Sequence, residues 1–345
     1  EGNLRVEENL GEGYVRLRVS EAERRQAKHD IQHVEDIVIE MLRNARDAGA
    51  DKVYLATTKE DGVRTLVFLD NGSGVPQDMQ ERIFDARVTS KLESMKMDRW
   101  GVHGRGMALF SIKQNTDEAR VVASDVDLGS VFKVSVATDR LGERADQSSW
   151  PQAVKDEDGH YVCARGPHNI IRAACEFALE ELRACDVYLG SPSEIAATLH
   201  SQASSRLDAS RLLFIDDEAE LPVVDRLGLA SDAEDFIRIC SGLGLEMSER
   251  TAHRILAGQI KPVRGVTARL LRERDSSSHA SAPVDLAKDR RGLRIAKDDM
   301  AQFSRAVERD FNDLASRYYL NLCGDPKIRV SRDRITVTFD LAKEE

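Results

Sequence analysis

Aromatic residues are scarce in this sequence: phenylalanine, tyrosine and tryptophan together make up only 5% of its 345 residues. Because large rings are few, we expect the hydrophobic core to be built mainly from leucine, isoleucine, valine and alanine. Hydrophobic residues at 41% and charged residues at 32% are nevertheless typical of a folded globular protein. The length is sufficient for two domains and for a core that needs no disulfide or metal.

Long apolar runs and closely spaced cysteines are also absent. No stretch approaches the roughly 18 apolar residues of a membrane span, and residues 1–16 are charged, unlike a secretory signal. The five cysteines are odd in number and widely spaced, with no C-x-x-C pair. These absences predict a cytoplasmic protein with reduced thiols, no membrane partner, and neither a disulfide framework nor a zinc site.

The periodicity of the first 140 residues predicts alternating helices and strands. We expect a strand at 14–20, and a helical stretch that begins near Ser20 and ends at Gly49. Polar residues rich in glycine and serine occupy positions 70–106, a length typical of functional loops. Further elements are expected as strands at 52–57, 63–69, 119–124 and 130–138 and a short helix at 107–114. The pattern predicts an α/β sandwich.

The remainder of the chain is predicted to be organised differently. Residues 141–168 are polar and irregular, which is typical of a linker, and residues 169–345 are predicted to be mainly helical. The helical region contains a low-complexity stretch at 275–283 and ends in a hairpin at 327–341. The overall prediction is an α+β chain with a domain at 1–140, a linker at 141–168 and an effector region at 169–345.

One part of this second region is basic, although the chain as a whole has a formal net charge of −10. Residues 232–274 resemble a helix-turn-helix, and cations are concentrated at 250–274. Such a segment predicts a nucleic-acid or protein partner; the alternative is a helical bundle with a solvated basic face. No aromatics are interleaved with the cations, so stacking on single strands is not favoured.

Three polar clusters stand out in the first region. Glu40, Asn44 and Asp47 are spaced by four and three residues, which places them along one helical stripe. Asp70-Asn-Gly-Ser-Gly74 follows an apolar strand directly, and Gly101-Val-His-Gly-Arg-Gly106 precedes a helix. Each pattern alone is compatible with a solvated helix face or a turn. Their order, spacing and element types together indicate a nucleotide site.

The sequence here resembles a known family. The stretches EMLRNARDAGA, DNGSGV, VTSK and GVHGRGMALFSI look like the ATPase domain shared by gyrase B, Hsp90, histidine kinases and MutL, known as the GHKL or Bergerat fold. The likeness covers roughly residues 20–140 and is locally strongest to MutL-type members. It implies a Bergerat-type sandwich with helices on one face of a mixed sheet, and an activity as a Mg-dependent ATPase with ATP and Mg²⁺ as cofactors.

The resemblance also implies residue roles. Glu40 would be the general base, Asn44 the Mg²⁺ ligand, and Asp70 the acceptor for the adenine amino group. The residues implied to complete the nucleotide site are Asp47, Gly72, Gly74, Lys91, Gly101, His103, Gly104, Arg105, Gly106 and Ser130. Glycines let the backbone approach the base, and amides at a helix N-terminus favour phosphate. Residues from about Phe84 to His103 would form a lid, and lid closure would favour a homodimer.

Two departures and several alternatives accompany the resemblance. Ser130 stands where many members have threonine, and Arg105 is unusual in the glycine loop. A histidine kinase would need a phosphoacceptor histidine further along the chain from the Asn44 helix than His29 or His33. His29 and His33 are four residues apart, a spacing that suits a metal. The ordinary interpretation is that both histidines lie on a polar helix face. A GHKL-type protein kinase is a further alternative, and Glu40 favours hydrolysis over it. A slow-turnover, ATP-responsive regulator is the other alternative.

Overall fold

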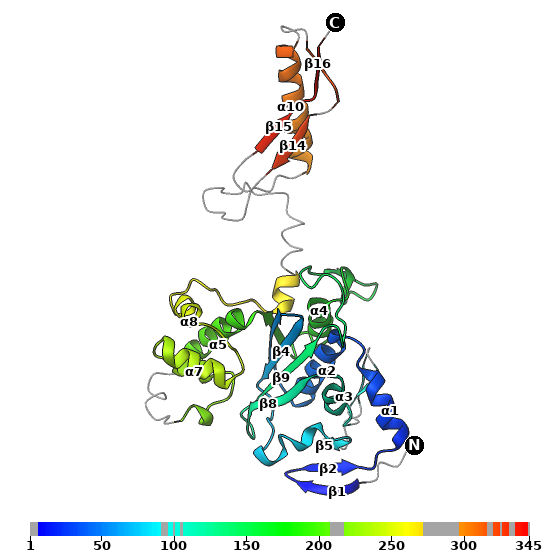
Figure 1. Ribbon diagram of the computed structural model, residues 1–345, viewed down its shortest axis with the longest axis vertical. Helices are drawn as coiled ribbons and strands as arrows, with labels where there is room; N and C mark the ends of the chain where they lie inside the picture. Colours follow the sequence, from blue (N-terminus) through cyan, green and yellow to red (C-terminus); the bar gives the residue numbers. More distant parts are fainter. Residues whose placement is uncertain are drawn as a thin grey trace. The chain divides into compact units, whose positions relative to one another are not determined.

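The structure is a computed structural model of the chain (Figure 1). It consists of two compact units, Glu1–Ser276 and Ser277–Glu345. The residues that the structure describes are 6–90, 96–98, 101–103, 106–207, 217–271, 297–315, 320–324, 326–330 and 335–343.

A five-stranded mixed sheet forms the centre of the first unit. Its strand order is β12-β3-β4-β9-β8, in which β12 runs parallel to β3 and the other neighbours are antiparallel. The strands are β3 Lys52–Glu60, β4 Val63–Asp70, β8 Glu118–Ser124, β9 Ser130–Ala137 and β12 Asp186–Gly190. This mixed sheet and its helices confirm the predicted α+β class.

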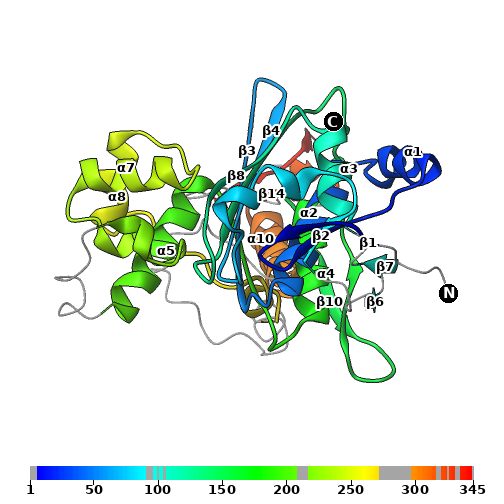
Figure 2. The same ribbon diagram turned by 90° about the horizontal axis from the view of Figure 1, so that it is seen from below.

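One face of the sheet is covered by α2 Val34–Asp47, α3 Ala108–Asn115 and α4 Ile170–Glu180. The apolar stripe predicted for the first helical region is buried, with Leu42 fully enclosed in the same core as Phe68 of β4. Helices α2 and α3, both from the first 140 residues, therefore lie on one face of the sheet, as expected for a Bergerat-type sandwich. Figure 2 shows these helices on one side of the strands.

The opposite face is covered by α5 Pro192–Arg206, α7 Ala233–Gly242 and α8 Glu249–Leu256. These helices lie on the other side of the strands in Figure 2. Their core includes Val67 and Leu69 of β4, which alternate with residues that face α2. Because both faces of β4 are apolar, both need a cover, and residues beyond 169 supply the second one.

The expected domain boundary near residue 140 is therefore not where the structure divides the chain. The first compact unit extends to Ser276, and β12 completes the edge of the sheet beside β3. The expected linker contains a hairpin of β10 Gln152–Lys155 and β11 Tyr161–Arg165. Its polar composition reflects exposed strands rather than an irregular connection, because three of the four residues of β10 and two of the five residues of β11 are exposed.

The N-terminal residues form a separate small sheet. Strands β1 Val6–Gly11, β2 Tyr14–Leu17 and β5 Val88–Thr89 pair in the order β1-β2-β5. Helix α1, Glu21–Asp30, follows with a capping box at Ser20. The helical stretch expected up to Gly49 is interrupted, because Ile31 is extended and His33 is the N-cap of α2. The break separates His29 from His33, so the expected spacing on one helix is not realised.

Short elements complete the first unit. Strands β6 Lys96–Asp98 and β7 Gly101–His103 pair antiparallel and form a two-stranded ribbon. The 3₁₀ turns are Gln77–Met79, Arg82–Phe84, Glu218–Glu220 and Arg226–Leu229. No helix within the described ranges is long and apolar enough to cross a membrane. Cys163, Cys175, Cys185 and Cys240 are buried, and Cys323 is exposed.

The second unit contains one long helix and two short strand pairs. Helix α10 spans Lys297–Ala315. Strands β14 Lys327–Val330 and β15 Ile335–Thr338 form the predicted hairpin, and β13 Leu320–Leu322 pairs with β16 Leu341–Lys343. Phe311 stacks on Phe339 with ring centroids 4.1 Å apart. The low-complexity stretch at 275–283 lies outside the described residues.

Candidate active site

A cavity of about 440 Å³ opens beside α2 and the ends of β4 and β9. Its volume is within the range of small-molecule sites, roughly 300–1,000 Å³. Seven of the residues predicted from the sequence line it, from four separate stretches of chain: Glu40, Asn44, Asp47, Asp70, Gly74, Gly106 and Ser130. The structure thus brings together most of the predicted nucleotide site in one cavity.

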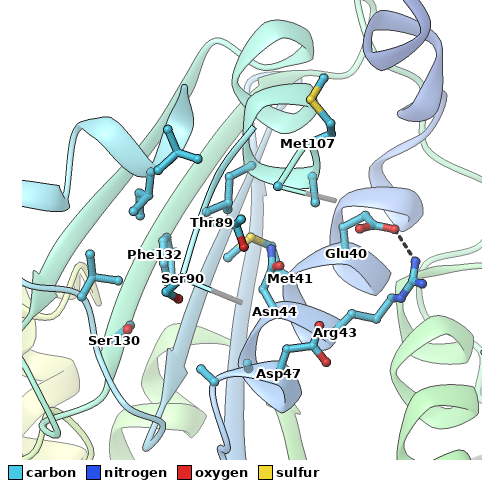
Figure 3. A pocket seen from close by; sticks show the side chains of 18 of the residues that line it. Glu40, Met41, Arg43, Asn44, Asp47, Thr89, Ser90, Met107, Ser130 and Phe132 are labelled. Carbon is cyan, nitrogen blue, oxygen red and sulfur yellow. Dashed lines mark hydrogen bonds and ion pairs between the residues drawn. The ribbon is translucent and has the colours of Figure 1, made fainter. Parts of the chain in front are cut away.

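Helix α2 provides the polar stripe along one side of the cavity. Figure 3 shows Glu40, Asn44 and Asp47 on successive turns of this helix. The opposite face of α2 is buried in the core, so the polar stripe is forced toward the cavity. The Nδ2 atom of Asn44 is buried and has no hydrogen-bond partner among the described residues. A buried amide in that state has hydrogen-bonding capacity left for a ligand.

Two of the α2 carboxylates are held by arginines of the same helix. The Nη1 atom of Arg43 lies 2.7 Å from Oε1 of Glu40, and this ion pair is visible in Figure 3. Nε of Arg46 lies 3.0 Å from Oδ1 of Asp47, and Nη1 of Arg46 reaches Glu181 beyond α4 at 3.1 Å. The charged side of α2 is therefore held by ion pairs within the helix and by one ion pair to the C-cap residue of α4.

Asp70 and Ser130 face each other across neighbouring strands. They are register partners in the β4–β9 ladder, and both are buried. Oδ1 of Asp70 accepts a hydrogen bond from the Gly72 amide at 2.8 Å. Ser130 contacts Ser124 through their hydroxyl oxygens, 3.2 Å apart. Ser130 is therefore directly across from Asp70 in the ladder, and both residues line the cavity.

The glycines of the loop after β4 are required by close backbone approaches. A Cβ on Gly74 would lie 1.8 Å from the carbonyl oxygen of Asp125, and one on Gly72 would lie 2.8 Å from that of Ala48. Gly129, which the sequence reasoning did not select, is equally constrained: its Cβ would lie 2.1 Å from the Asp70 carbonyl oxygen. No side chain larger than hydrogen fits at these contacts, so the loop lies tightly against α2 and the β8–β9 turn.

The far wall of the cavity is the start of α3. Gly106, with a φ of +67°, leads into Met107, which is the N-cap, and Ala108 begins the helix. All three line the cavity. Amides and the helix dipole at this end favour an anion. Gly101 and His103 lie in β7, while Lys91, Gly104 and Arg105 lie outside the described residues.

Several lining residues were missed by the sequence reasoning. Tyr14 comes from β2, which reaches the site because it pairs with β5 beside Thr89. Burial raises the pKa of Tyr14, and its hydroxyl bonds to Ser90. No local pattern marks Tyr14, but Phe132 could have been found, because on a strand it shares a face with Ser130.

The residues present fit a magnesium nucleotide. The cavity offers the Asn44 amide and carboxylates on one side, and a helix N-terminus on the other. Within the described ranges, no group of three or more histidine, cysteine or acidic side chains could hold a metal alone. A Mg²⁺ ion needs only one or two protein ligands besides phosphate oxygens and water.

Comparison with known proteins adds a family to this geometry. The model of the family described as histidine kinase-, DNA gyrase B-, and HSP90-like ATPase matches residues 31–124. The DNA mismatch repair proteins MutL of Staphylococcus aureus strains Newman and JH1 are each 28% identical over 136 residues, which is 36% of this chain and 20% of each relative. The chain thus spans about one fifth of the length of these relatives. Residues 31–124 therefore match the GHKL ATPase superfamily, and this stretch is locally MutL-like.

Proposed function

We propose that this chain binds Mg-ATP in the cavity beside α2 and hydrolyses it. The observation that carries the proposal is the convergence of Glu40, Asn44, Asp70 and Ser130, from separate segments, on one cavity of about 440 Å³. Phosphoryl transfer depends mainly on positioning and on compensation of charge, and the site offers both. A magnesium ion bound there would supply positive charge to the phosphates.

Each residue has a distinct task in this proposal. Glu40 orients and deprotonates the attacking water, and Asn44 holds the metal through its side-chain oxygen, one helical turn further along α2. Asp70 accepts from the adenine amino group, and Asp47 and Ser130 support the pocket. The amides at Gly106 and the start of α3 receive the phosphates. Lys91, Gly101, His103, Gly104 and Arg105 belong to the proposed lid and glycine loop.

The proposed consequence of ATP binding is a change of state. Residues from about Phe84 to His103 act as a lid, and its closure favours a homodimer. The regions outside residues 31–124 then transmit the state to a protein or nucleic-acid partner. The cytoplasmic location expected from the cysteines stays a prediction.

A second candidate function is an ATP-responsive regulator with slow turnover. The packing of α7 against α8 supports it, because a helix-turn-helix requires two consecutive helices in contact. A GHKL-type protein kinase is a third candidate, and the carboxylate at Glu40 favours hydrolysis over it. Measuring the turnover of the purified chain separates the first candidate from the second.

Glu40→Gln tests the proposed chemistry. The variant keeps the shape of the side chain and removes the base, so hydrolysis should fall about 10²–10⁴-fold while ATP binding by calorimetry is kept. Asn44→Ala should instead weaken Mg-dependent binding. Glu157→Gln, at an exposed site in the β10–β11 hairpin, is the control for contaminating activity. Unchanged phosphate release by Glu40→Gln would refute the role of Glu40, and absence of ATP binding by the native chain would refute the proposal as a whole.

A further inference from the structure

Helix α8 presents a basic face to solvent. Ala252 and Ile255 are buried in the core beneath the sheet, which fixes the orientation of the helix. Arg250, His253 and Arg254 occupy the other side and are exposed, at the three- and four-residue spacing of one helical stripe. Figure 1 shows α8 beside α7 and α5 in the first unit. A hollow at this surface is lined by Glu249, Arg250, His253, Arg254, Ala257 and Gln259.

The support of α8 is rigid. Leu243 and Leu245, in the turn between α7 and α8, are buried, and Gly244 between them takes a φ of +69°. The hydroxyl of Ser248 caps α8 by accepting from the Thr251 amide at 3.3 Å. The turn is therefore held by two apolar anchors and a cap, so the basic face is presented in a defined direction.

The cations around α8 lack carboxylate partners within the described part of the chain. Arg250, Arg254, Lys261 and Arg264 are exposed and form no ion pair there. On α7, by contrast, Arg238 is paired with Glu218 at 2.5 Å. Between 247 and 271 Glu249 is the sole acidic residue, and it lies 3.7 Å from the His253 ring. An acidic chain thus carries a concentrated cationic surface that the described side chains leave uncompensated.

We propose that the exposed face of α8 binds duplex DNA by lying in the major groove. This proposal deepens the proposed function by naming its partner. The groove is about 12 Å wide and admits one helix of about 10–12 Å diameter. The described residues that line the hollow are three basic side chains, one small and one amide side chain, and Glu249, which lies beside His253; none of them is aromatic, so the surface suits a phosphate backbone rather than unpaired bases. Arg250 and Arg254 contact the DNA from successive turns of α8.

The experiment uses the full chain and a fluorescent duplex of about 30 base pairs, which is roughly three helical turns. Arg250→Glu combined with Arg254→Glu should weaken binding at least about tenfold and reduce the slope of log K against log salt by about two, since each phosphate contact contributes about one. Arg165→Glu combined with Arg183→Glu is the matched control: both arginines are exposed, and the net charge changes equally. The control should bind like the native chain.

Three results would overturn the proposal. Equal affinity of the native chain and the α8 variant would place the contact elsewhere. Equal binding of single strands and duplex would refute the groove. Binding of polyglutamate in preference to duplex would identify an acidic protein segment as the partner. Thermal unfolding of all variants checks that they are folded. Calorimetry with ATP on the same samples tests the proposed function separately, because the duplex titration contains no ATP.

Discussion

Arg43 and Glu40 form an ion pair on α2 with only 2.7 Å between Nη1 and Oε1. Arg43 is 3% exposed and Glu40 is 22% exposed, so the pair lies between the core and the cavity. A guanidinium at this distance restricts the rotamer of the carboxylate that we propose as the base. Arg43 is therefore a positioning residue rather than a catalytic one.

Arg43→Met should slow ATP hydrolysis about tenfold to a hundredfold, because small displacements of a reacting group have effects of this size. ATP affinity should change little, and Arg43→Lys should recover part of the rate, since lysine keeps a cation but not the planar fork. Steady-state kinetics and calorimetry measure both quantities. If the rate is unaffected in a folded Met variant, Glu40 does not depend on Arg43.

Asp70→Asn should weaken ATP binding by roughly 10–100-fold, because a hydrogen bond to a charged acceptor contributes about 1.5–3 kcal/mol. Asparagine still accepts from the Gly72 amide, so the loop after β4 is expected to keep its shape. The native chain should prefer ATP to GTP, since guanine presents an oxygen where adenine has its amino group. Asp61→Asn, in the exposed β3–β4 turn, is the control. Equal affinity of the native chain for the two nucleotides would disprove the role of Asp70.

Gly129→Ala should disrupt the nucleotide pocket, because the added Cβ would lie 2.1 Å from the Asp70 carbonyl oxygen. Gly159→Ala is a matched control, since Gly159 has nearly the same positive φ but no atom within 4 Å of the added Cβ. The control should lose about 1–2 kcal/mol of unfolding free energy from backbone strain alone. Gly129→Ala should lose clearly more and bind ATP weakly. Equal losses in urea unfolding would mean that the close approach has no energetic weight.

Burial raises the pKa of the Cys240 thiol from 9.0 to about 12. Because the folded state binds this proton more tightly, its contribution to stability is complete below pH 9 and is lost as the pH rises toward 12. At pH 10.5 the loss for one thiol is about 2 kcal/mol. Urea unfolding between pH 8 and 10.5 should therefore show a shallower fall for Cys240→Ala than for the native chain. Parallel curves for the two proteins would contradict this prediction.

Much of the first unit was predictable from local patterns. The apolar stripe of α2 and the strands β3 and β4 appear as expected, because each depends on residues close in sequence. The GHKL motifs are likewise short stretches of sequence whose order and spacing can be recognised without the structure. For these reasons the sequence alone determined the family of residues 31–124 and the stripe of polar residues on α2.

The tertiary structure alone decided how the later chain is used. Polar residues at 141–168 predicted a linker, yet they include a hairpin, and β12 and α5 complete the same compact unit. Composition could not show this, because the second apolar face of β4 is covered only when Val67 and Leu69 pack against side chains more than 120 residues away in the sequence. Tyr14 reaches the cavity for the same kind of reason, through the pairing of β2 with β5. Local sequence sets the period and caps of each element, whereas the partner of each apolar face is chosen by long-range packing.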